Sequence, residues 1–157
     1  MSAGLRVYIS SSWKNKDRVR AIANGIRLIG HEVYDFTDPA CRKTPEIPPE
    51  KYPKDFDPTK QTYREYLSGI SEWYDTVEEN RRALHWANVV LLLLPSGNDA
   101  HADAFYGLGR GAVLAVVGQP KAGERSTTHL WAHTFLDNDS EVLEWLERIA
   151  RSKAAWQ

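Results

Sequence analysis

The stretch VVLLLLPSGNDAHADAFYGLGRG, residues 89–111, decides the fold of this 157-residue chain. Its first six residues are all apolar, which is typical of a strand buried on both faces of a parallel sheet. The Pro-Ser-Gly triplet at 95–97 ends this strand, and residues from about 100 to 110 follow as a helix. The stretch therefore predicts a buried strand that leads through a small polar loop into a helix.

Strands and helices alternate on both sides of this stretch. Further strands are predicted at residues 5–10, 31–36, 112–117 and 133–136, and further helices at 15–29, 59–87 and 140–153. A break is expected near Gly69, and Gly30 is placed to end the first helix in a left-handed conformation. The alternation predicts an α/β fold with an open, mostly parallel five-stranded sheet and helices on both faces, as in Rossmann-like and flavodoxin-like proteins.

The length and the proline pattern predict how the chain is organised. Residues 1–157 are expected to form one domain. Six of the eight prolines lie between Pro39 and Pro58, so residues from about 37 to 58 are predicted to be a proline-rich insert without regular structure. Such a segment is too long for a simple connector and is interpreted as a lid or a flexible excursion.

Composition excludes several classes of function. The formal charge of −1 gives no sign of a nucleic-acid partner, and the single cysteine, Cys41, rules out an internal disulfide. The longest apolar run has six residues, far fewer than the ~20 of a membrane helix. With no leader-like start, we expect a cytoplasmic protein without membrane contact. The sequence shows no metal-binding cluster, and neither a metal nor another cofactor is expected.

Two loops are predicted to meet at the edge of the sheet where ligands bind in open α/β folds, beyond the carboxyl ends of the strands. One follows the first strand and the other follows the strand at 89–94. The candidate binding residues on these loops are Ser10, Ser11 and Trp13 on the first, and Gly97, Asn98 and Asp99 on the second.

Two carboxylates follow the second of these loops. Asp99 and Asp103 are four residues apart, so they share one face of a helix. We expect Asp103 on the first turn, where the positive helix end would keep it ionised and able to attack an electrophilic sugar carbon. The alternative is that both aspartates only cap and solvate the helix. His101 is interpreted as structural, and the GLGRG glycines end a helix instead of opening one, so they do not form a dinucleotide-binding pattern.

Two segments resemble the nucleoside 2-deoxyribosyltransferase superfamily, which includes nucleotide N-glycosidases. The opening VYISSSWKNKDRVRAIANGIRLIGHEVYDF is similar to the first strand, loop, helix and strand of that family. The segment RRALHWANVVLLLLPSGNDAHADAFYGLGRGAVLAVV is similar to the family pattern A-L-x-W-A-D-x-x-x-L-L-P-x-G-x-S-A-H-x-E, followed by glycines and an apolar strand. The resemblance covers most of the chain except the proline-rich insert.

The resemblance implies a site and a mechanism. Asp103 stands where the family has its nucleophilic glutamate, and Tyr8 resembles the tyrosine that orients this nucleophile. The carboxylate would displace a nucleobase from C1′, and water or a second base would resolve the covalent intermediate. The implied partners are a nucleoside or nucleotide and a free nucleobase. His129 and Trp131 resemble the late segment that completes a neighbouring subunit's pocket, so a homodimer or larger homo-oligomer is expected.

The chain also departs from the family pattern. Asp103 is one methylene shorter than glutamate, and Asn80 replaces an aspartate that contacts the base. An amide can hydrogen-bond a base but cannot supply a proton as an acid; Glu79 or Asp75 would have to substitute. These departures favour an alternative function, that of a nucleoside-binding or nucleotide-binding protein with little turnover. A third hypothesis is cleavage of NAD-like dinucleotides, against which the lack of an adenylate site counts.

Charge near the site bears on the substrate. Asp99 replaces a family serine, and its carboxylate would repel a 5′-phosphate. The sequence therefore favours a nucleoside over a nucleotide, unless Lys14, Arg18 or Arg110 reverses the local field.

Overall fold

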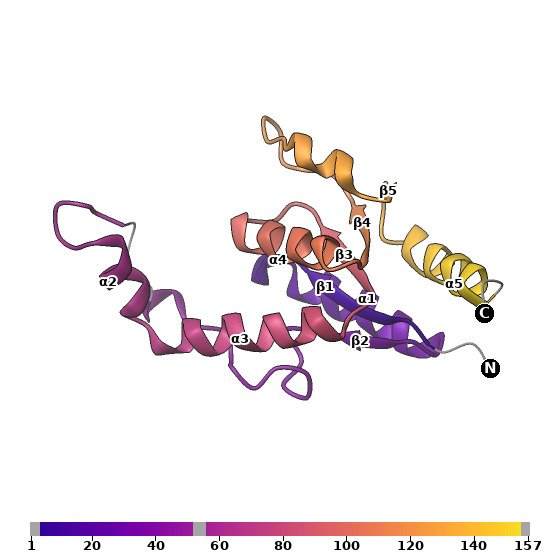
Figure 1. Cartoon of the computed structure of the whole chain (residues 1–157), viewed down its shortest axis with the longest axis horizontal. Helices are drawn as coiled ribbons and strands as arrows, with labels where there is room; N and C mark the ends of the chain where they lie inside the picture. The colour runs from indigo at the N-terminus through magenta and orange to yellow at the C-terminus, as the bar shows by residue number, and fades with distance from the viewer. Residues whose placement is uncertain (1–3, 52–55, 155–157) are drawn as a thin grey trace.

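Five parallel strands form the centre of the molecule. The computed structural model describes residues 4–51 and 56–154. The strands are β1 (Arg6–Ser10), β2 (Glu32–Tyr34), β3 (Val89–Leu93), β4 (Val113–Val117) and β5 (Thr134–Leu136), in the sheet order β2-β1-β3-β4-β5 (Figure 1). All four pairings are parallel, which confirms the predicted sheet. The order has its switch point between β1 and β3, as in flavodoxin-like folds.

Helices cover both faces of this sheet. The helices are α1 (Lys16–Leu28), α2 (Tyr63–Ser68), α3 (Ser71–Trp86), α4 (Asn98–Gly109) and α5 (Glu141–Ala154), with short 3-10 turns at Trp13–Asn15, Pro49–Lys51 and Thr127–Trp131. The contacts group α1 with α5 on one face and α3 with α4 on the other. The described part of the chain contains no helix that is both long and apolar enough to cross a membrane.

Burial follows the predicted hydrophobic pattern. Every residue of β3 is inaccessible to solvent. The predicted apolar face of α1 packs against the sheet through Val19, Ile22 and Ile26. Gly30 follows α1 with φ +85°, a backbone conformation that a glycine adopts without strain. The first strand-helix-strand unit is therefore built as its sequence predicts.

The helix that carries the two aspartates begins earlier than predicted. It starts at Asn98, after Gly97 in an extended conformation. Asp99 consequently lies in the first turn and Asp103 in the second. The prediction that the helix end stabilises the Asp103 charge was wrong, because the effect of the helix dipole fades beyond the first turn.

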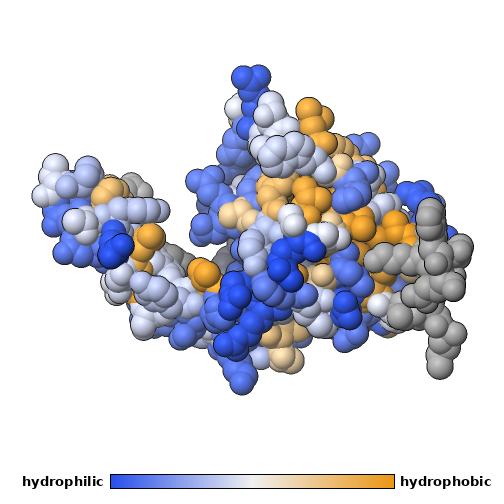
Figure 2. Space-filling view, in the orientation of Figure 1, coloured by the Kyte–Doolittle hydropathy of each residue, from blue (hydrophilic) through white to orange (hydrophobic). Residues whose placement is uncertain are grey.

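The sequence predicted at 59–87 as one interrupted helix forms two helices. The break falls at Gly69 and Ile70, as predicted. Thr62 caps α2 through a reciprocal pair of hydrogen bonds with Glu65, which explains why the helix starts at Tyr63. The short α2 projects away from the sheet at the end of α3 (Figure 1). The space-filling view is hollowed between this projection and the body of the molecule (Figure 2).

The first part of the proline-rich insert is anchored to α3. The Glu79 carboxylate accepts hydrogen bonds from the backbone N–H groups of Lys43 (2.7 Å) and Thr44 (2.9 Å), and also from the Thr44 hydroxyl. Arg42, Thr44 and Ile47 are buried. Residues 52–55 of the predicted insert lie outside the described residues, and the lid interpretation stays a prediction.

Candidate active site

A cavity of about 660 Å³ opens at the carboxyl edge of the sheet, between α4 and the projecting α2 with the start of α3. It lies at the switch point between β1 and β3, where ligands bind in such folds. Seven of the predicted site residues line it together: Tyr8, Ser10, Ser11, Trp13, Asn80, Asp99 and Asp103. Distant parts of the sequence are thus brought into one pocket.

Asp103 is held by a chain of hydrogen bonds. The Tyr8 hydroxyl donates to Asp103 Oδ2 over 2.9 Å, and Asn80 Nδ2 donates to the same oxygen over 3.0 Å. The Tyr34 hydroxyl donates to Asn80 Oδ1 (3.1 Å) and so fixes the orientation of the amide. Tyr34 also stacks on Tyr8, with 5.1 Å between the ring centroids. The predicted pairing of Tyr8 with Asp103 is present, and Tyr34 is a member that the sequence analysis missed.

This arrangement leaves one oxygen of the carboxylate available. Both donors bind Oδ2, and no residue in the described part of the chain donates to Asp103 Oδ1. Burial, together with the negative charge of Asp103, raises the pKa of Tyr8 well above its ordinary value. Tyr8 therefore stays protonated and acts as a donor at all ordinary pH values. The geometry presents an oriented carboxylate with one oxygen free to meet an electrophile.

The Asp103 carboxyl is harder to ionise than an exposed aspartate. Burial raises its pKa above the usual 3.8, and the charge of Asp99 adds to the rise. The hydrogen bonds from Tyr8 and Asn80, and the charge of Arg42, oppose it. Asp103 was expected to be stabilised as an anion by its helix; instead, two side-chain donors and a nearby arginine do this against a cost of burial.

The raised pKa predicts a dependence of stability on pH. The folded protein binds the Asp103 proton more tightly than the unfolded chain does, so the free energy of unfolding falls as the pH rises through the window that opens near 3.8. The Asp103→Asn variant lacks this loss. Urea unfolding at a series of pH values should show the variant gaining stability relative to the parent as the pH rises from 3 to 7. A difference between the two proteins that stays constant with pH would contradict this expectation.

The serines of the first loop connect elements of the fold. Ser10 Oγ donates to the Ala100 carbonyl oxygen over 2.7 Å, and Ser11 Oγ donates to that of Leu93 over 3.0 Å. Ser11 also accepts from Asn15 Nδ2 (2.9 Å). These bonds join the end of β1 to β3 and to the first turn of α4. They fix the floor of the cavity below Asp103.

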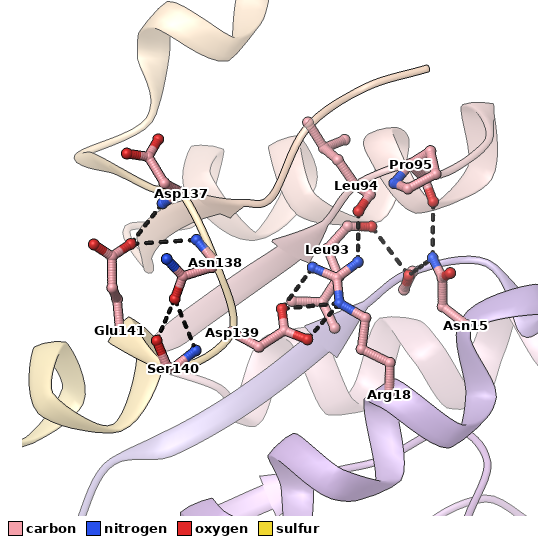
Figure 3. A network of polar contacts seen from close by, with 11 residues as sticks. Asn15, Arg18, Leu93, Leu94, Pro95, Asp137, Asn138, Asp139, Ser140 and Glu141 are labelled. Carbon is pink, nitrogen blue, oxygen red and sulfur yellow. Dashed lines mark hydrogen bonds and ion pairs between the residues drawn. The ribbon is translucent and has the colours of Figure 1, made fainter. Parts of the chain in front are cut away.

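A second polar network holds the neighbouring strand ends (Figure 3). The Arg18 guanidinium binds the Asp139 carboxylate through Nε and Nη2, with N–O distances of 2.7–2.8 Å, and donates from Nη1 to the Leu94 carbonyl oxygen at 2.5 Å. Asn15 donates to the carbonyl oxygen of Pro95 over 2.8 Å. Arg18 is therefore used to join α1 to the ends of β3 and β5. It does not line the cavity that holds Asp99 and Asp103.

An arginine of the proline-rich insert does reach the cavity. Arg42 is 6% exposed and lies over the Trp13 ring, with 5.4 Å between its Cζ and the ring centroid. Phe36 packs its ring edge-on against Trp13 (5.1 Å). The sequence analysis missed Arg42, because the path of the insert is set by long-range hydrogen bonds with α3. No signal in the sequence singles out Arg42, because residues 37–58 contain four cations, Arg42, Lys43, Lys51 and Lys54.

Three predicted binding residues line a different cavity. Gly97, Asn98 and His129 border a space of about 540 Å³, together with His101 and Phe105. Positions 98, 101 and 105 follow one another along one face of α4, and positions 99 and 103 follow another, so the two cavities lie on different faces of this helix. The structure therefore does not bring these three residues together with Asp103.

His101 and His129 form a pair in this second cavity. Their Nε2 atoms are 2.8 Å apart, and His101 Nδ1 is 2.8 Å from the Gly97 carbonyl oxygen. A carbonyl only accepts, so His101 carries a proton on Nδ1, and one of the two Nε2 atoms donates to the other. Burial lowers the pKa of His129, and His101 adds to this. The predicted subunit-contact residue Trp131 is 67% exposed. Its ring lies nearly perpendicular to that of Phe105, with 6.0 Å between the ring centroids.

Neither candidate for a substitute acid faces Asp103. Glu79 is bound to the backbone of the insert, and both Glu79 and Asp75 line a third cavity, on the face of α3 that neighbours the face of Asn80. Within residues 4–51 and 56–154, no group of three His, Cys, Asp or Glu side chains is arranged to hold a metal ion.

Comparison with known proteins supports the fold. No sequence profile of a known protein family matches the chain. No curated protein matches it by sequence. Among solved structures, it is similar to a 2-deoxyribosyltransferase from the psychrotolerant bacterium Bacillus psychrosaccharolyticus, with a TM-score of 0.54 and 15% sequence identity. The match covers 87% of this chain and 89% of the other. At this identity, the similarity shows a shared α/β architecture.

Proposed function

We propose that the protein cleaves or transfers the N-glycosidic bond of (2′-deoxy)ribonucleosides, with Asp103 as the nucleophile. The observation that carries the proposal is the oriented carboxylate at the switch point of the sheet, fixed at Oδ2 by Tyr8 and Asn80 and open at Oδ1. The similarity in fold to a 2-deoxyribosyltransferase supports the choice of substrate, as does the sequence resemblance around Asp103.

The proposed reaction is a double displacement. Asp103 Oδ1 attacks C1′, the C1′–O bond forms, and the C1′–N bond breaks with its electron pair leaving on the base. Water, or a second nucleobase, then attacks C1′ and releases Asp103 as a carboxylate. Tyr8 and Asn80 hold the carboxylate at a fixed angle, which saves the entropy of orienting it. Whether the protein is a transferase or a hydrolase depends on which acceptor reaches the intermediate.

The second candidate is a binding protein for nucleosides or nucleotides with little turnover. Asn80 favours it, because an amide that donates to Asp103 supplies no proton to a leaving base. The same cavity would serve both functions. For either, we propose a protein of the cytoplasm that assembles as a homodimer or larger homo-oligomer, with His129 and Trp131 near the contact between subunits.

A panel of nucleosides distinguishes the two candidates. The protein is incubated with purine and pyrimidine 2′-deoxynucleosides and ribonucleosides, with and without a second free base, and the products are separated by chromatography. We expect release of the base in water and its exchange when a second base is present. Saturable binding without any released or exchanged base would reject the enzyme in favour of the binding protein.

A further inference from the structure

The cavity that holds Asp103 contains a buried cation with unused donors. A guanidinium carries five N–H groups, and the described residues accept only one from Arg42, the bond from Nη2 to Thr76 Oγ1 (2.7 Å). Arg42 Nε is buried without a hydrogen-bond partner, and none of the ion pairs among the described residues includes Arg42. The Arg42 charge is balanced through space by Asp103 and Glu79, but most of its N–H groups have no acceptor among the described residues. A ligand that supplies acceptors to those groups would offset the cost of burying them.

The surroundings of Arg42 fit a flat aromatic ligand. Its guanidinium lies over Trp13, and Phe36 meets the same ring edge-on. Further along the cavity, Tyr66 and Trp73 pack together with 5.7 Å between their ring centroids. Aromatic faces and a planar cation bind a planar base by stacking. The faces of aromatic rings offer no hydrogen bonds to a phosphate, and the Asp99 carboxylate in the same cavity would repel it.

We infer that Arg42 contacts the leaving base and selects bases that carry carbonyl oxygens, such as hypoxanthine or uracil, over adenine. The inference rests on the proposed function and deepens it. Arginine binds the paired O6 and N7 acceptors of oxo-purines, whereas adenine presents an amino group in place of O6. Arg42 would thus stabilise the departing base without a general acid.

The base can leave C1′ without a proton donor. When Asp103 Oδ1 bonds to C1′, the electron pair of the C1′–N bond leaves on the ring nitrogen, and the base departs as an anion. The charge spreads to the carbonyl oxygen, where the Arg42 N–H groups stabilise it. The base takes its proton from water after release. Stabilisation of the anionic base by Arg42 would take the place of the proton that an acid at position 80 would supply.

Binding of free bases tests the inference apart from turnover. The affinities of hypoxanthine and adenine are measured by calorimetry for the parent protein, Arg42→Gln and Arg42→Lys. We expect Arg42→Gln to weaken hypoxanthine roughly tenfold or more and adenine by less than about threefold. Arg42→Lys keeps the charge but lacks the planar guanidinium. Its affinity for hypoxanthine should lie between those of the parent protein and Arg42→Gln. In turnover, Arg42→Gln should lose more rate on 2′-deoxyinosine than on 2′-deoxyadenosine. A loss shared by both substrates reflects the Arg42 charge that favours the Asp103 carboxylate.

Arg20→Gln is the matched control. Arg20 donates from Nε to Thr37 Oγ1 (3.1 Å) and so also holds the start of the insert, without lining the cavity. It should leave the ratio of the two affinities unchanged. Equal weakening of both bases by Arg42→Gln would make Arg42 merely structural and overturn the inference. So would unchanged base binding with a loss of affinity for inorganic phosphate. A preference for hypoxanthine without turnover would reject the proposed enzyme and leave the inference standing.

Discussion

Replacing Asp103 with asparagine should lower the rate of base release roughly ten-thousandfold, the loss typical of removing a residue that the chemistry requires. Asparagine has nearly the same shape, and its Oδ1 can still accept the Tyr8 hydroxyl. The fold and the cavity should therefore survive. An amide oxygen, however, is a poor nucleophile and cannot form a stable ester with C1′. Chromatography of the released base at saturating nucleoside measures the effect.

Asp99→Asn is the control for this prediction. Asp99 lies one turn earlier on the same face of α4 and lines the same cavity, so the substitution makes the same change in charge. Because Tyr8 and Asn80 hold Asp103 and not Asp99, the control should lose less than about tenfold. Mass spectrometry of the acid-quenched parent protein should find a glycosyl group on residue 103. Equal losses in the two variants, or an adduct on another residue, would remove Asp103 from the proposed role.

The pairing of Tyr8 with Asp103 was predicted from the family resemblance, and the sheet topology is consistent with it. Tyr8 lies on β1 and Asp103 on the helix after β3, and β1 pairs directly with β3. A parallel sheet puts the carboxyl ends of its strands at one edge. The observed pairing of β1 with β3 brings the two side chains close. The resemblance, and not the alternation of strands and helices, singled out Tyr8.

Arg42 was not predictable in the same way. The insert has no hydrophobic period, and hydrogen bonds from Lys43 and Thr44 to Glu79, 35 or 36 residues away, decide its path. Nothing local specifies such contacts. The placement of Gly97 and Asn98 failed for another reason. The loop after β3 was treated as one binding unit, although the helix starts at Asn98 and turns its side chain about 100° away from Asp99.

Because α4 packs closely on the sheet at Gly107, a substitution there should have the second large effect, a loss of fold stability. A Cβ added at Gly107 would lie 2.7 Å from Val90 Cγ2 and 3.3 Å from Leu84 Cδ2. Val90 is fully buried in the central strand, so its methyl group can move only by displacing other side chains of the close-packed core. Gly107→Ala should therefore destabilise the fold by about 2 kcal/mol, as overpacking does, although alanine favours a helix over glycine by roughly 1 kcal/mol.

The same substitution should also reach the chemistry. Asp103 lies one turn before Gly107 on α4, so relief of the clash moves the carboxylate away from Tyr8. A displacement of about 1 Å can cost roughly a hundredfold in rate. Urea unfolding and base release, measured on one preparation, report the two losses. Gly109→Ala is the matched control, because an added Cβ there meets nothing within 4 Å. It should leave the rate unchanged and the stability equal or slightly higher.

Val90→Ala separates the clash from other causes. It removes the atom that an alanine at position 107 would strike, at the cost of a small cavity in the core. In a double-mutant cycle, the two substitutions together should therefore cost less than the sum of the separate losses, by about 1 kcal/mol or more. The rate should recover in parallel, because both effects have one origin in the distance between α4 and β3. Additive losses would mean that α4 is not pressed on the sheet at Gly107, and that the position of Asp103 is fixed by the hydrogen bonds from Tyr8 and Asn80 alone.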